Sequence, residues 1–223
     1  MPSPLRAALF DLDGTLIDSA TGIASALNHT LQALGHAPEP ETLIRTWIGD
    51  GARQLLRQGL QHAGGDLPDG EAFESAYALL MRHYADSLPL QARAYPGAED
   101  ALQGLHARGV RVALCTNKPQ RFIAPLFEAL GWNDLFDAVV GGDTLPVHKP
   151  DPEPLWHIAR GFGIDPAQSV MVGDSRTDAE AARAAGMPLV LVDYGYRRGY
   201  DLQTAGALQV TADLRSLLDL AVE

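Results

Sequence analysis

The sequence predicts an α/β fold in which helices cover both faces of a parallel sheet and an all-helical segment is inserted after the first strand. Two observations lead to this prediction. Short apolar runs without alternation of polar and apolar residues recur among helical patterns from residue 95 onward, as is typical of buried parallel strands. A similar run occupies residues 7–10, whereas residues 18–90 show helical patterns only. We therefore expect a core domain of residues 1–17 and 91–223 and a helical domain of residues 18–90.

The first strand ends in two carboxylates. Asp11 and Asp13 follow the run 7–10 at a spacing that places both side chains on one side of an extended backbone. Carboxylates this close repel each other, so one should be protonated or both should hold a cation. Gly14 allows a sharp turn, and Thr15 adds a hydroxyl. Taken alone, such a turn is as compatible with a solvated loop as with chemistry.

The inserted segment should consist of helices separated by glycine and proline breaks. A stripe with a period near 3.6 runs through residues 18–35, and a second amphipathic pattern covers residues 69–87. Between them, a short helix is expected at residues 43–44, and Gly49-Asp50-Gly51 interrupts the chain. Asp50 is expected to be the N-cap of the helix that follows.

Residues 95–223 should contribute the other strands and helices. Strands are expected at residues 110–115, 136–140, 169–172 and 189–192. Helices are expected at residues 97–108, 119–131, 152–162, 176–185 and 211–221. Because strands and helices alternate, the sheet should be parallel.

The charge of the chain restricts its partners. A formal net charge of −11 argues against nucleic acid and anionic membranes, because no basic stripe is present to neutralise phosphates. A small phosphorylated metabolite is compatible with this charge if cations gather locally. Only two of the 17 basic side chains are lysines, Lys118 and Lys149, and both are expected in loops at the site. The charge is also compatible with a monomer or a weak homodimer.

The cysteine content and the hydropathy favour a cytoplasmic protein. Cys115 is the only cysteine, which excludes an internal disulfide and a thiolate metal cluster, and its apolar neighbours indicate a buried strand residue. The N-terminus lacks the apolar region of a signal peptide, and no stretch has the length of a transmembrane helix.

Polar side chains follow four of the predicted strands. Because ligands of open parallel sheets bind beyond the carboxyl ends of the strands, these side chains should share one site. They belong to Asp11, Asp13, Thr116, Asn117, Lys118, Asp143, Asp174 and Asp178, with Lys149 in the loop after Asp143.

Two of these groups suit an anion. Thr116 and Asn117 precede a helix that starts near Pro119, so their hydroxyl and backbone N–H groups can bind an anion or simply cap the helix. Lys149 stands next to Pro150 in a loop that proline fixes, although a solvated loop lysine is the alternative.

The acidic groups suit a metal ion. Asp174 and Asp178 are four positions apart and face the same way on a helical turn. With Asp11 and Asp13 they bring four carboxylates together, and Mg²⁺ suits such a set because it takes hard oxygen ligands and keeps waters that a phosphate can replace. A helix cap at Asp174 and Ser175 is the alternative.

These residues, in this order on alternating strands and helices, resemble the motifs of the haloacid dehalogenase superfamily. The matching stretches are Asp11-Leu12-Asp13-Gly14-Thr15, Thr116-Asn117, Lys149-Pro150, and Gly173-Asp174 with Asp178. The resemblance spans the chain and implies a Rossmann-like core with a small helical C1 cap. Within the superfamily the chain looks most like bacterial phosphoglycolate phosphatases, through residues 116–119, 141–146, 172–175 and 194–196. Asp50, His148 and Arg197-Arg198 depart from the expected pattern and leave the substrate open.

The resemblance implies hydrolysis of a phosphomonoester through an aspartyl-phosphate. Asp11 would attack phosphorus. Asp13 would protonate the leaving alkoxide and then activate the water that cleaves the intermediate. Lys149 and Thr116 would stabilise the charge of the phosphoryl oxygens.

The resemblance also implies Mg²⁺ as the cofactor. Asp11, the backbone carbonyl of Asp13 and Asp174 would hold the ion, and Asp178 would bind it directly or act indirectly.

The expected substrate is 2-phosphoglycolate, whose carboxylate needs a cation or free N–H groups. Arg45 and Arg53 flank the break at residues 49–51, where a helix start offers N–H groups and an arginine can grip a carboxylate. Solvated arginines are the alternative. The candidate substrate-binding residues are Thr15, Asn117, Lys118, Gly49, Arg45 and Arg53.

Several other functions are weighed against this one. A phosphatase of a sugar phosphate or an amino-sugar phosphate, and a phosphohexomutase, remain open because they share the motifs. Asp13 argues against a dehalogenase, which has no alkoxide to protonate, and the absence of lysine from residues 18–95 argues against a phosphonate hydrolase. A non-catalytic binding protein conflicts with the intact set of Asp11, Asp13, Lys149 and Asp174.

Overall fold

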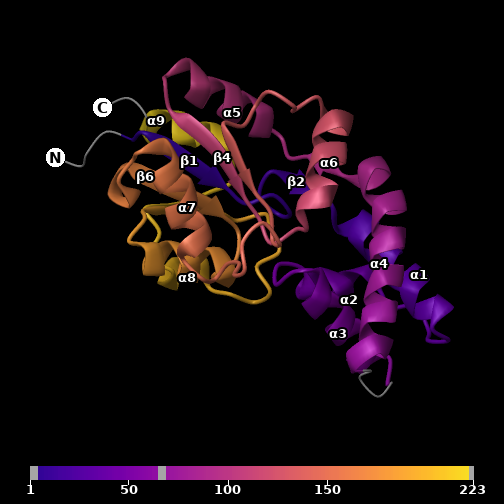
Figure 1. The fold of residues 1–223 in the computed structure, drawn as a ribbon. Coiled ribbons are helices and arrows are strands. Elements are labelled where there is room, and N and C mark those ends of the chain that lie inside the picture. The colour runs from indigo at the N-terminus through magenta and orange to yellow at the C-terminus, as the bar shows by residue number, and fades with distance from the viewer. Residues whose placement is uncertain (1–4, 65–68, 221–223) are drawn as a thin grey trace.

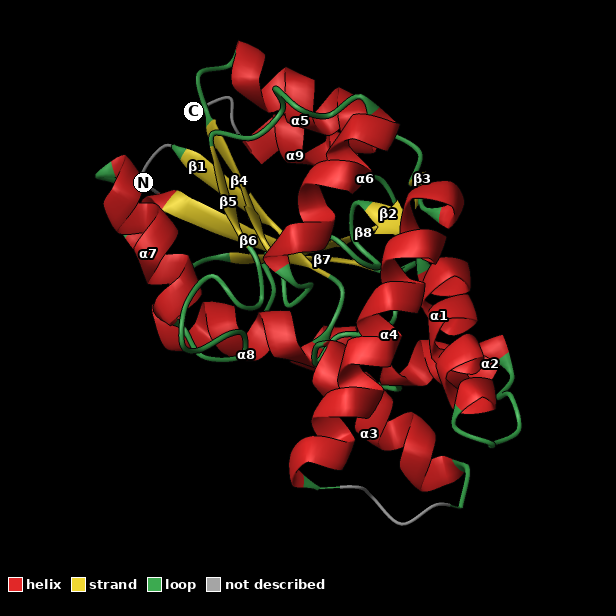
Figure 2. Cartoon of the chain, turned by 45° about the vertical axis from the view of Figure 1, so that its right-hand side comes forward, coloured by secondary structure: helices red, strands yellow, loops and turns green. Residues whose placement is uncertain are grey.

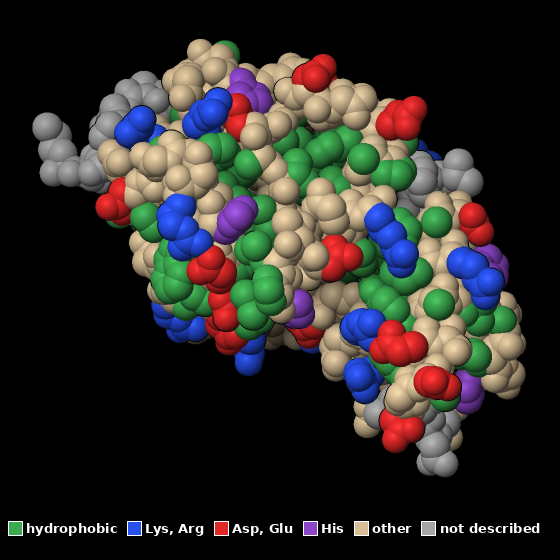
Figure 3. All heavy atoms as spheres, in the orientation of Figure 1, with side chains coloured by type: hydrophobic (Ala, Val, Ile, Leu, Met, Phe, Trp, Pro, Cys, Tyr) green, Lys and Arg blue, Asp and Glu red, His purple; other side chains and the backbone are tan. Residues whose placement is uncertain are grey.

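The computed structural model describes residues 5–64 and 69–220 of the chain. A twisted sheet with helices on both faces forms one part of the molecule, and a cluster of helices forms the other (Figures 1 and 2). Acidic and basic side chains are interspersed on the face shown in Figure 3. Within the described residues, no helix combines the length and the apolar character needed to span a bilayer.

The sheet has six parallel strands. Across the sheet they are β5 (Ala138–Val140), β4 (Arg111–Cys115), β1 (Ala7–Phe10), β6 (Ser169–Gly173), β7 (Leu189–Val192) and β8 (Gln209–Thr211). In register, Phe10 at the end of the central strand β1 lies opposite Leu114 on one side and Val172 on the other. The polar residues that follow these three strands therefore meet at one edge of the sheet.

Both faces of the sheet are covered by helices, which confirms the predicted α/β fold. One face carries α5 (Ala98–Ala107), α6 (Ile123–Leu130) and α9 (Leu217–Leu220), and the other carries α7 (Glu153–Phe162) and α8 (Arg176–Ala185) (Figure 2). Ala8 and Phe10 belong to the first hydrophobic core, and Ala7 and Leu9 belong to the second. This double burial explains why the strands read as continuous apolar runs.

The second part of the molecule, here called the helical cap, lies between β1 and the rest of the sheet in sequence. It contains α1 (Ala20–Ala33), α2 (Glu41–Ile44), the 3₁₀ helix η1 (Arg45–Trp47), α3 (Ala52–His62) and α4 (Gly70–Gln91). Helices α1 and α4 pack side by side (Figure 1). Leu27 of α1 and Leu80 of α4 are fully buried in the hydrophobic core that also contains Phe10 of β1, so the cap and one face of the sheet share a core.

A short antiparallel ribbon connects the two parts. It pairs β2 (Ile17–Asp18) with β3 (Arg93–Ala94). The prediction that residues 18–90 contain helices only is therefore wrong at Asp18. A strand of two residues is too short to show an alternating pattern.

The N-cap of α3 is Gly51, and no side chain caps this helix. The prediction that Asp50 is the N-cap is therefore wrong. Asp50 instead accepts hydrogen bonds from Thr177 Oγ1 and Arg198 Nη1, which lie far along the chain. Gly51 has a φ of 86°, a conformation that glycine adopts without steric cost.

The C-terminal region differs most from the prediction. Thr211 ends β8, and the helix expected from residue 211 starts later as the 3₁₀ helix η5 (Leu214–Ser216), followed by α9. Asp213 caps this turn by accepting a hydrogen bond from the backbone N–H of Arg215. Residue 221 of the expected helix lies outside the described residues. The other 3₁₀ helices are η2 (Gln120–Phe122), which opens the helix predicted at residue 119, η3 (Pro166–Gln168) and η4 (Leu202–Thr204).

Candidate active site

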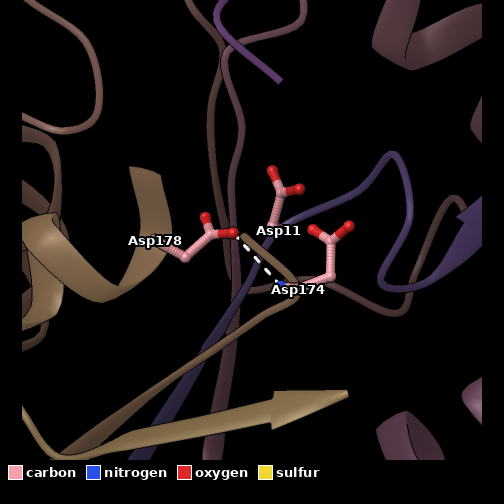
Figure 4. Close-up of side chains that lie close together, drawn as sticks. All are labelled: Asp11, Asp174 and Asp178. Atoms are coloured by element: carbon pink, nitrogen blue, oxygen red, sulfur yellow. Dashed lines mark hydrogen bonds between the residues drawn. The ribbon is translucent and has the colours of Figure 1, made fainter. Parts of the chain in front are cut away.

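The carboxyl ends of the central strands bring the predicted residues together. Asp11 follows β1, Thr116 follows β4 and Asp174 follows β6. Asp178 lies in the first turn of α8, and Lys149 reaches the same point from the loop after β5. The carboxylates of Asp11, Asp174 and Asp178 converge in Figure 4, as the strand-end argument predicts.

The three carboxylates form a strongly acidic cluster. One oxygen of each lies within 4.8 Å of the others. Burial, with the charges of Asp178 and Asp13, raises the pKa of Asp11 to about 6, although Lys149 opposes the shift. Burial and the charges of Asp178 and Asp11 raise the pKa of Asp174 well above its usual value. A divalent cation removes this repulsion, so the donor set fits Mg²⁺.

Asp178 already has hydrogen-bond partners on both oxygens. Oδ2 accepts from the backbone N–H groups of Asp174 and Ser175, at 3.2 and 3.1 Å, and from Ser175 Oγ at 2.7 Å. Oδ1 accepts from Lys149 Nζ at 2.7 Å. Ser175 and Asp178 also form the capping box of α8. These contacts suit Asp178 to orienting the loop after β6 and Lys149.

Lys149 neutralises part of the acidic cluster. Its Nζ lies 2.9 Å from Asp11 Oδ1 and 2.7 Å from Asp178 Oδ1, and the residue is 2% exposed. Burial alone would lower the pKa of Lys149, but the two carboxylates outweigh burial and raise it. The ammonium group therefore stays charged and can stabilise a phosphoryl group at Asp11.

Asp13 is held by a second lysine. Lys118 Nζ lies 2.8 and 2.9 Å from the two oxygens of Asp13, and Ser19 Oγ also donates to this carboxylate. Lys118 further donates to the hydroxyl of Tyr84, on cap helix α4, at 3.3 Å. Ser19 and Tyr84 were not predicted as site residues. Tyr84 could be found in the sequence only as part of the apolar face of its helix.

Two loops cradle Asp174. Thr15 Oγ1 donates to Asp174 Oδ1 at 3.3 Å, and the backbone N–H of Tyr196 donates to Oδ2. A Cβ atom on Gly14, whose φ is 94°, would lie 2.3 Å from Asp174 Oδ2. Gly14 is therefore required for the close approach of the loop after β1 to this carboxylate.

A small cavity separates the sheet edge from the cap. Its volume is about 30 Å³. The sheet side is lined by Asp11, Asp13, Thr116, Asn117, Lys118 and Pro119. The cap side is lined by Ile23, Ile48, Gly49, Gly51, Ala52, Leu55 and Tyr84. Three of the predicted substrate-binding residues, Gly49, Asn117 and Lys118, are therefore at the cavity, whereas Thr15 does not line it and is buried against Asp174.

The two predicted arginines do not line the cavity. Arg45 pairs with Asp18 and Glu41, at 3.1 and 3.0 Å. Arg53 donates to both carboxylate oxygens of Glu74, at 2.7 and 2.9 Å, and its side chain is 51% exposed. Each arginine therefore has an acidic partner within the cap or the connecting ribbon.

Comparison with known proteins agrees with this geometry. The family model of haloacid dehalogenase-like hydrolases matches residues 5–186. The chain is 44% identical over 217 residues to the phosphoglycolate phosphatase of Pseudomonas putida, covering 96% of this chain and 78% of the relative. It is 44% identical over 204 residues to the phosphoglycolate phosphatase of Nitrosospira multiformis, covering 90% of this chain and 88% of the relative.

A solved structure is also similar to this chain over nearly its whole length. The crystal structure of a predicted phosphoglycolate phosphatase from Haemophilus somnus 129PT matches with a TM-score of 0.90 at 31% identity and covers 98% of both chains. The similarity thus extends over both the sheet and the cap. The chain therefore belongs to the haloacid dehalogenase-like hydrolases, as its motifs predicted, and is similar over most of its length to bacterial phosphoglycolate phosphatases.

Proposed function

We propose that this chain hydrolyses 2-phosphoglycolate to glycolate and phosphate through an aspartyl-phosphate on Asp11, in a Mg²⁺-dependent reaction. The observation that carries the proposal is the pairing of two carboxylates with two lysines at one cavity. Asp11 contacts Lys149, and Asp13 contacts Lys118. In this view residues 18–90 form a cap domain over a core domain of residues 1–17 and 91–223.

Asp11 is the proposed nucleophile. Its carboxylate oxygen forms a bond to phosphorus while the bond from phosphorus to the ester oxygen breaks, and water later cleaves the acyl phosphate. With a pKa of about 6 even before a cation is present, the Asp11 carboxyl is mostly ionised above neutral pH. Lys149, at 2.9 Å from Asp11 Oδ1, is placed to stabilise the charge on the transferred group, and Thr116 lines the same cavity.

Asp13 is the proposed general acid and base. It gives a proton to the leaving alkoxide in the first step and takes one from the attacking water in the second. Its side chain lines the cavity while Lys118 and Ser19 fix its orientation. The Lys118 ammonium stays protonated, because Asp13 and Tyr84 raise its pKa by more than burial lowers it. Lys118 therefore positions Asp13 rather than exchanging a proton.

Asp11 and Asp174 would hold Mg²⁺, together with the backbone carbonyl of Asp13. When bound, the ion supplies positive charge to the phosphoryl oxygens and to the acidic cluster. Asp174 is kept in place for this role by Thr15 and by the backbone of Tyr196.

The substrate assignment is supported by the lining of the cavity and by the relatives of the chain. The wall at Gly51 and Ala52 is the start of α3, whose first backbone N–H groups have no partner within the helix. The relatives named above as phosphoglycolate phosphatases support the same substrate.

The test is a panel of phosphate esters ranked by kcat/KM with Mg²⁺ present. The panel contains 2-phosphoglycolate, ethyl phosphate, p-nitrophenyl phosphate and several sugar and amino-sugar phosphates. We expect 2-phosphoglycolate to rank first and Asp11→Asn to abolish turnover of every ester. Faster hydrolysis of a sugar phosphate would refute the substrate and leave the chemistry, whereas full activity of Asp11→Asn would refute the chemistry itself.

A further inference from the structure

The cap contributes one polar side chain to the cavity. Six of its seven lining residues are apolar or glycine, and only Tyr84 carries a side chain that forms hydrogen bonds, as far as the described residues go. A polar group of the substrate that faces the cap must therefore meet Tyr84 or the backbone.

Tyr84 is held in a fixed position by the sheet domain. It is 4% exposed, and its ring packs against Phe122 with the ring centroids 5.0 Å apart. Its hydroxyl oxygen accepts a hydrogen bond from Lys118 Nζ, which also contacts both oxygens of Asp13. The three N–H groups of Lys118 are thus directed at Asp13 and Tyr84.

The phenolic proton of Tyr84 remains for a ligand. Because the oxygen accepts from Lys118, the O–H must point elsewhere, and it donates to no acceptor in the part of the chain that the structure describes. Burial raises the pKa of Tyr84 to about 12, so the hydroxyl keeps its proton at neutral pH. An O–H group beside a charged ammonium group favours an anionic acceptor.

We propose that Tyr84 is a specificity-determining residue that donates its phenolic O–H to the anionic group that the substrate carries beyond its phosphate ester. This inference rests on the proposed function, in which that group is the carboxylate of 2-phosphoglycolate. The phosphoryl end lies at Asp11, and the opposite end of a short substrate then faces the cap. An ester that lacks the carboxylate accepts no hydrogen bond from the Tyr84 hydroxyl.

The variant Tyr84→Phe tests this role, because it removes the O–H and keeps the ring that packs on Phe122. We expect kcat/KM for 2-phosphoglycolate to fall roughly 10- to 100-fold, as for loss of a hydrogen bond to a charged group. Ethyl phosphate has the same chain length without the carboxylate. Its kcat/KM should change by less than about twofold, because its apolar end loses no hydrogen bond.

Tyr77→Phe is the matched control. Tyr77 lies on the same helix but outside the lining of the cavity, where the guanidinium of Arg53 stacks 4.2 Å from its ring centroid. This variant should leave kcat/KM unchanged for both esters. Thermal melts of both variants establish that they are folded.

Each result decides the proposal. An equal loss on both esters would overturn it, because Tyr84 would then act through Lys118 and Asp13 and not on the substrate. Unchanged activity on both esters would overturn it as well. Failure of the proposed function is detected separately, since a wild-type enzyme that does not prefer 2-phosphoglycolate to ethyl phosphate refutes the substrate before any variant is made.

Discussion

Each of the two carboxylates that follow β1 is held by its own lysine. Asp11 contacts Lys149 at 2.9 Å, and Asp13 contacts Lys118 at 2.8 and 2.9 Å. The first pair is shared with Asp178, and the second reaches the cap through Tyr84. In the proposed mechanism, the pair of Asp11 and Lys149 acts on the phosphoryl group, and the pair of Asp13 and Lys118 acts on the leaving group.

This division predicts different responses to the leaving group. Asp13→Asn should lower kcat roughly 10²- to 10⁴-fold for alkyl phosphates, which need a proton on the leaving oxygen, and less for p-nitrophenyl phosphate. Lys149→Ala should lower kcat roughly 10²- to 10³-fold for both esters, because it stabilises charge on the transferred group. Lys149→Arg, which keeps a cation, checks that charge is the cause. The same leaving-group dependence in the Asp13 and Lys149 variants would contradict these roles.

The acidic cluster predicts that activity depends on Mg²⁺ and that the affinity for Mg²⁺ falls at low pH. Chelation by EDTA should abolish activity, and Mg²⁺ should restore it. Protons compete with the ion for Asp11, whose pKa is about 6, and for Asp174, whose pKa is also raised. The Kd for Mg²⁺, measured by calorimetry, should therefore increase as the pH falls below about 6. Asp174→Asn should weaken binding at every pH, and undiminished affinity in this variant would exclude Asp174 as a ligand.

At the scale of elements, hydrogen bonds at residues 49 and 50 attach the cap to the sheet domain. Asp50 Oδ2 pairs with Arg198 Nη1 at 2.5 Å, and Oδ1 accepts from Thr177 Oγ1 at 3.0 Å. The amide of Asn117 donates to the carbonyl of Gly49 at 3.0 Å. Arg198 has a φ of 53°, an uncommon conformation for a residue with a side chain, and this backbone carries the guanidinium that meets Asp50.

Loss of the hydrogen bonds of Asp50 should increase the mobility of the cap segment that lines the cavity. In Asp50→Ala we expect amide hydrogen exchange in the segment 48–56 to speed up roughly 3- to 10-fold, since a partly exposed charged hydrogen bond contributes modestly. Mass spectrometry of peptides from this segment measures the effect. Arg197→Ala is the matched control, because it removes the neighbouring charge and leaves the pair intact. Equal exchange in all three proteins would show that the pair does not hold the loop.

At the scale of the whole molecule, the cap and one face of the sheet share a hydrophobic core. Trp47 and Leu80 of the cap belong to the same buried cluster as Phe10 and Trp132 of the sheet domain. The cap therefore cannot unfold without exposing apolar surface on the sheet domain, so both parts should unfold in one transition.

Single-tryptophan variants measure this cooperativity. In a chain that retains only Trp47 or only Trp132, the midpoint in urea from tryptophan fluorescence should equal the midpoint from far-ultraviolet circular dichroism of the same chain. Leu80→Ala, at a fully buried position, should lower the free energy of unfolding by about 2–5 kcal/mol and shift both midpoints together. Two separate transitions would mean that the cap is an independent folding unit.

The parts of this molecule that follow from the sequence are those set by local spacing. The run 7–10 with Asp11 and Asp13 predicts a strand end, and repeated strand ends in a parallel sheet predict a shared site. Contacts between segments that are far apart along the chain leave no regular spacing in the sequence. Asp50 has the local signature of an N-cap, yet its partner Arg198 lies 148 positions away. In the sequence, Tyr84 is likewise recognisable only as one residue of an apolar helix face.

An ion pair within the cap explains why Arg53, which was predicted to bind the substrate carboxylate, does not line the cavity. Arg53 lies at a helix start near the site, but Glu74, 21 positions away on the neighbouring helix, accepts hydrogen bonds from its Nη1 and Nη2. The pairing of α3 with α4 is a tertiary feature, so the competition between a substrate carboxylate and Glu74 is visible only in the fold.

The burial of both lysines has a consequence for handling the protein. Lys118 is 3% and Lys149 is 2% exposed, and these are the only lysines in the sequence. The folded surface thus offers no lysine side chain to succinimidyl esters, aldehydes or amine-directed cross-linkers. Lysine-directed labels and surface attachments therefore find no target on the folded protein, and an adduct on either lysine would report that the structure around that lysine has opened.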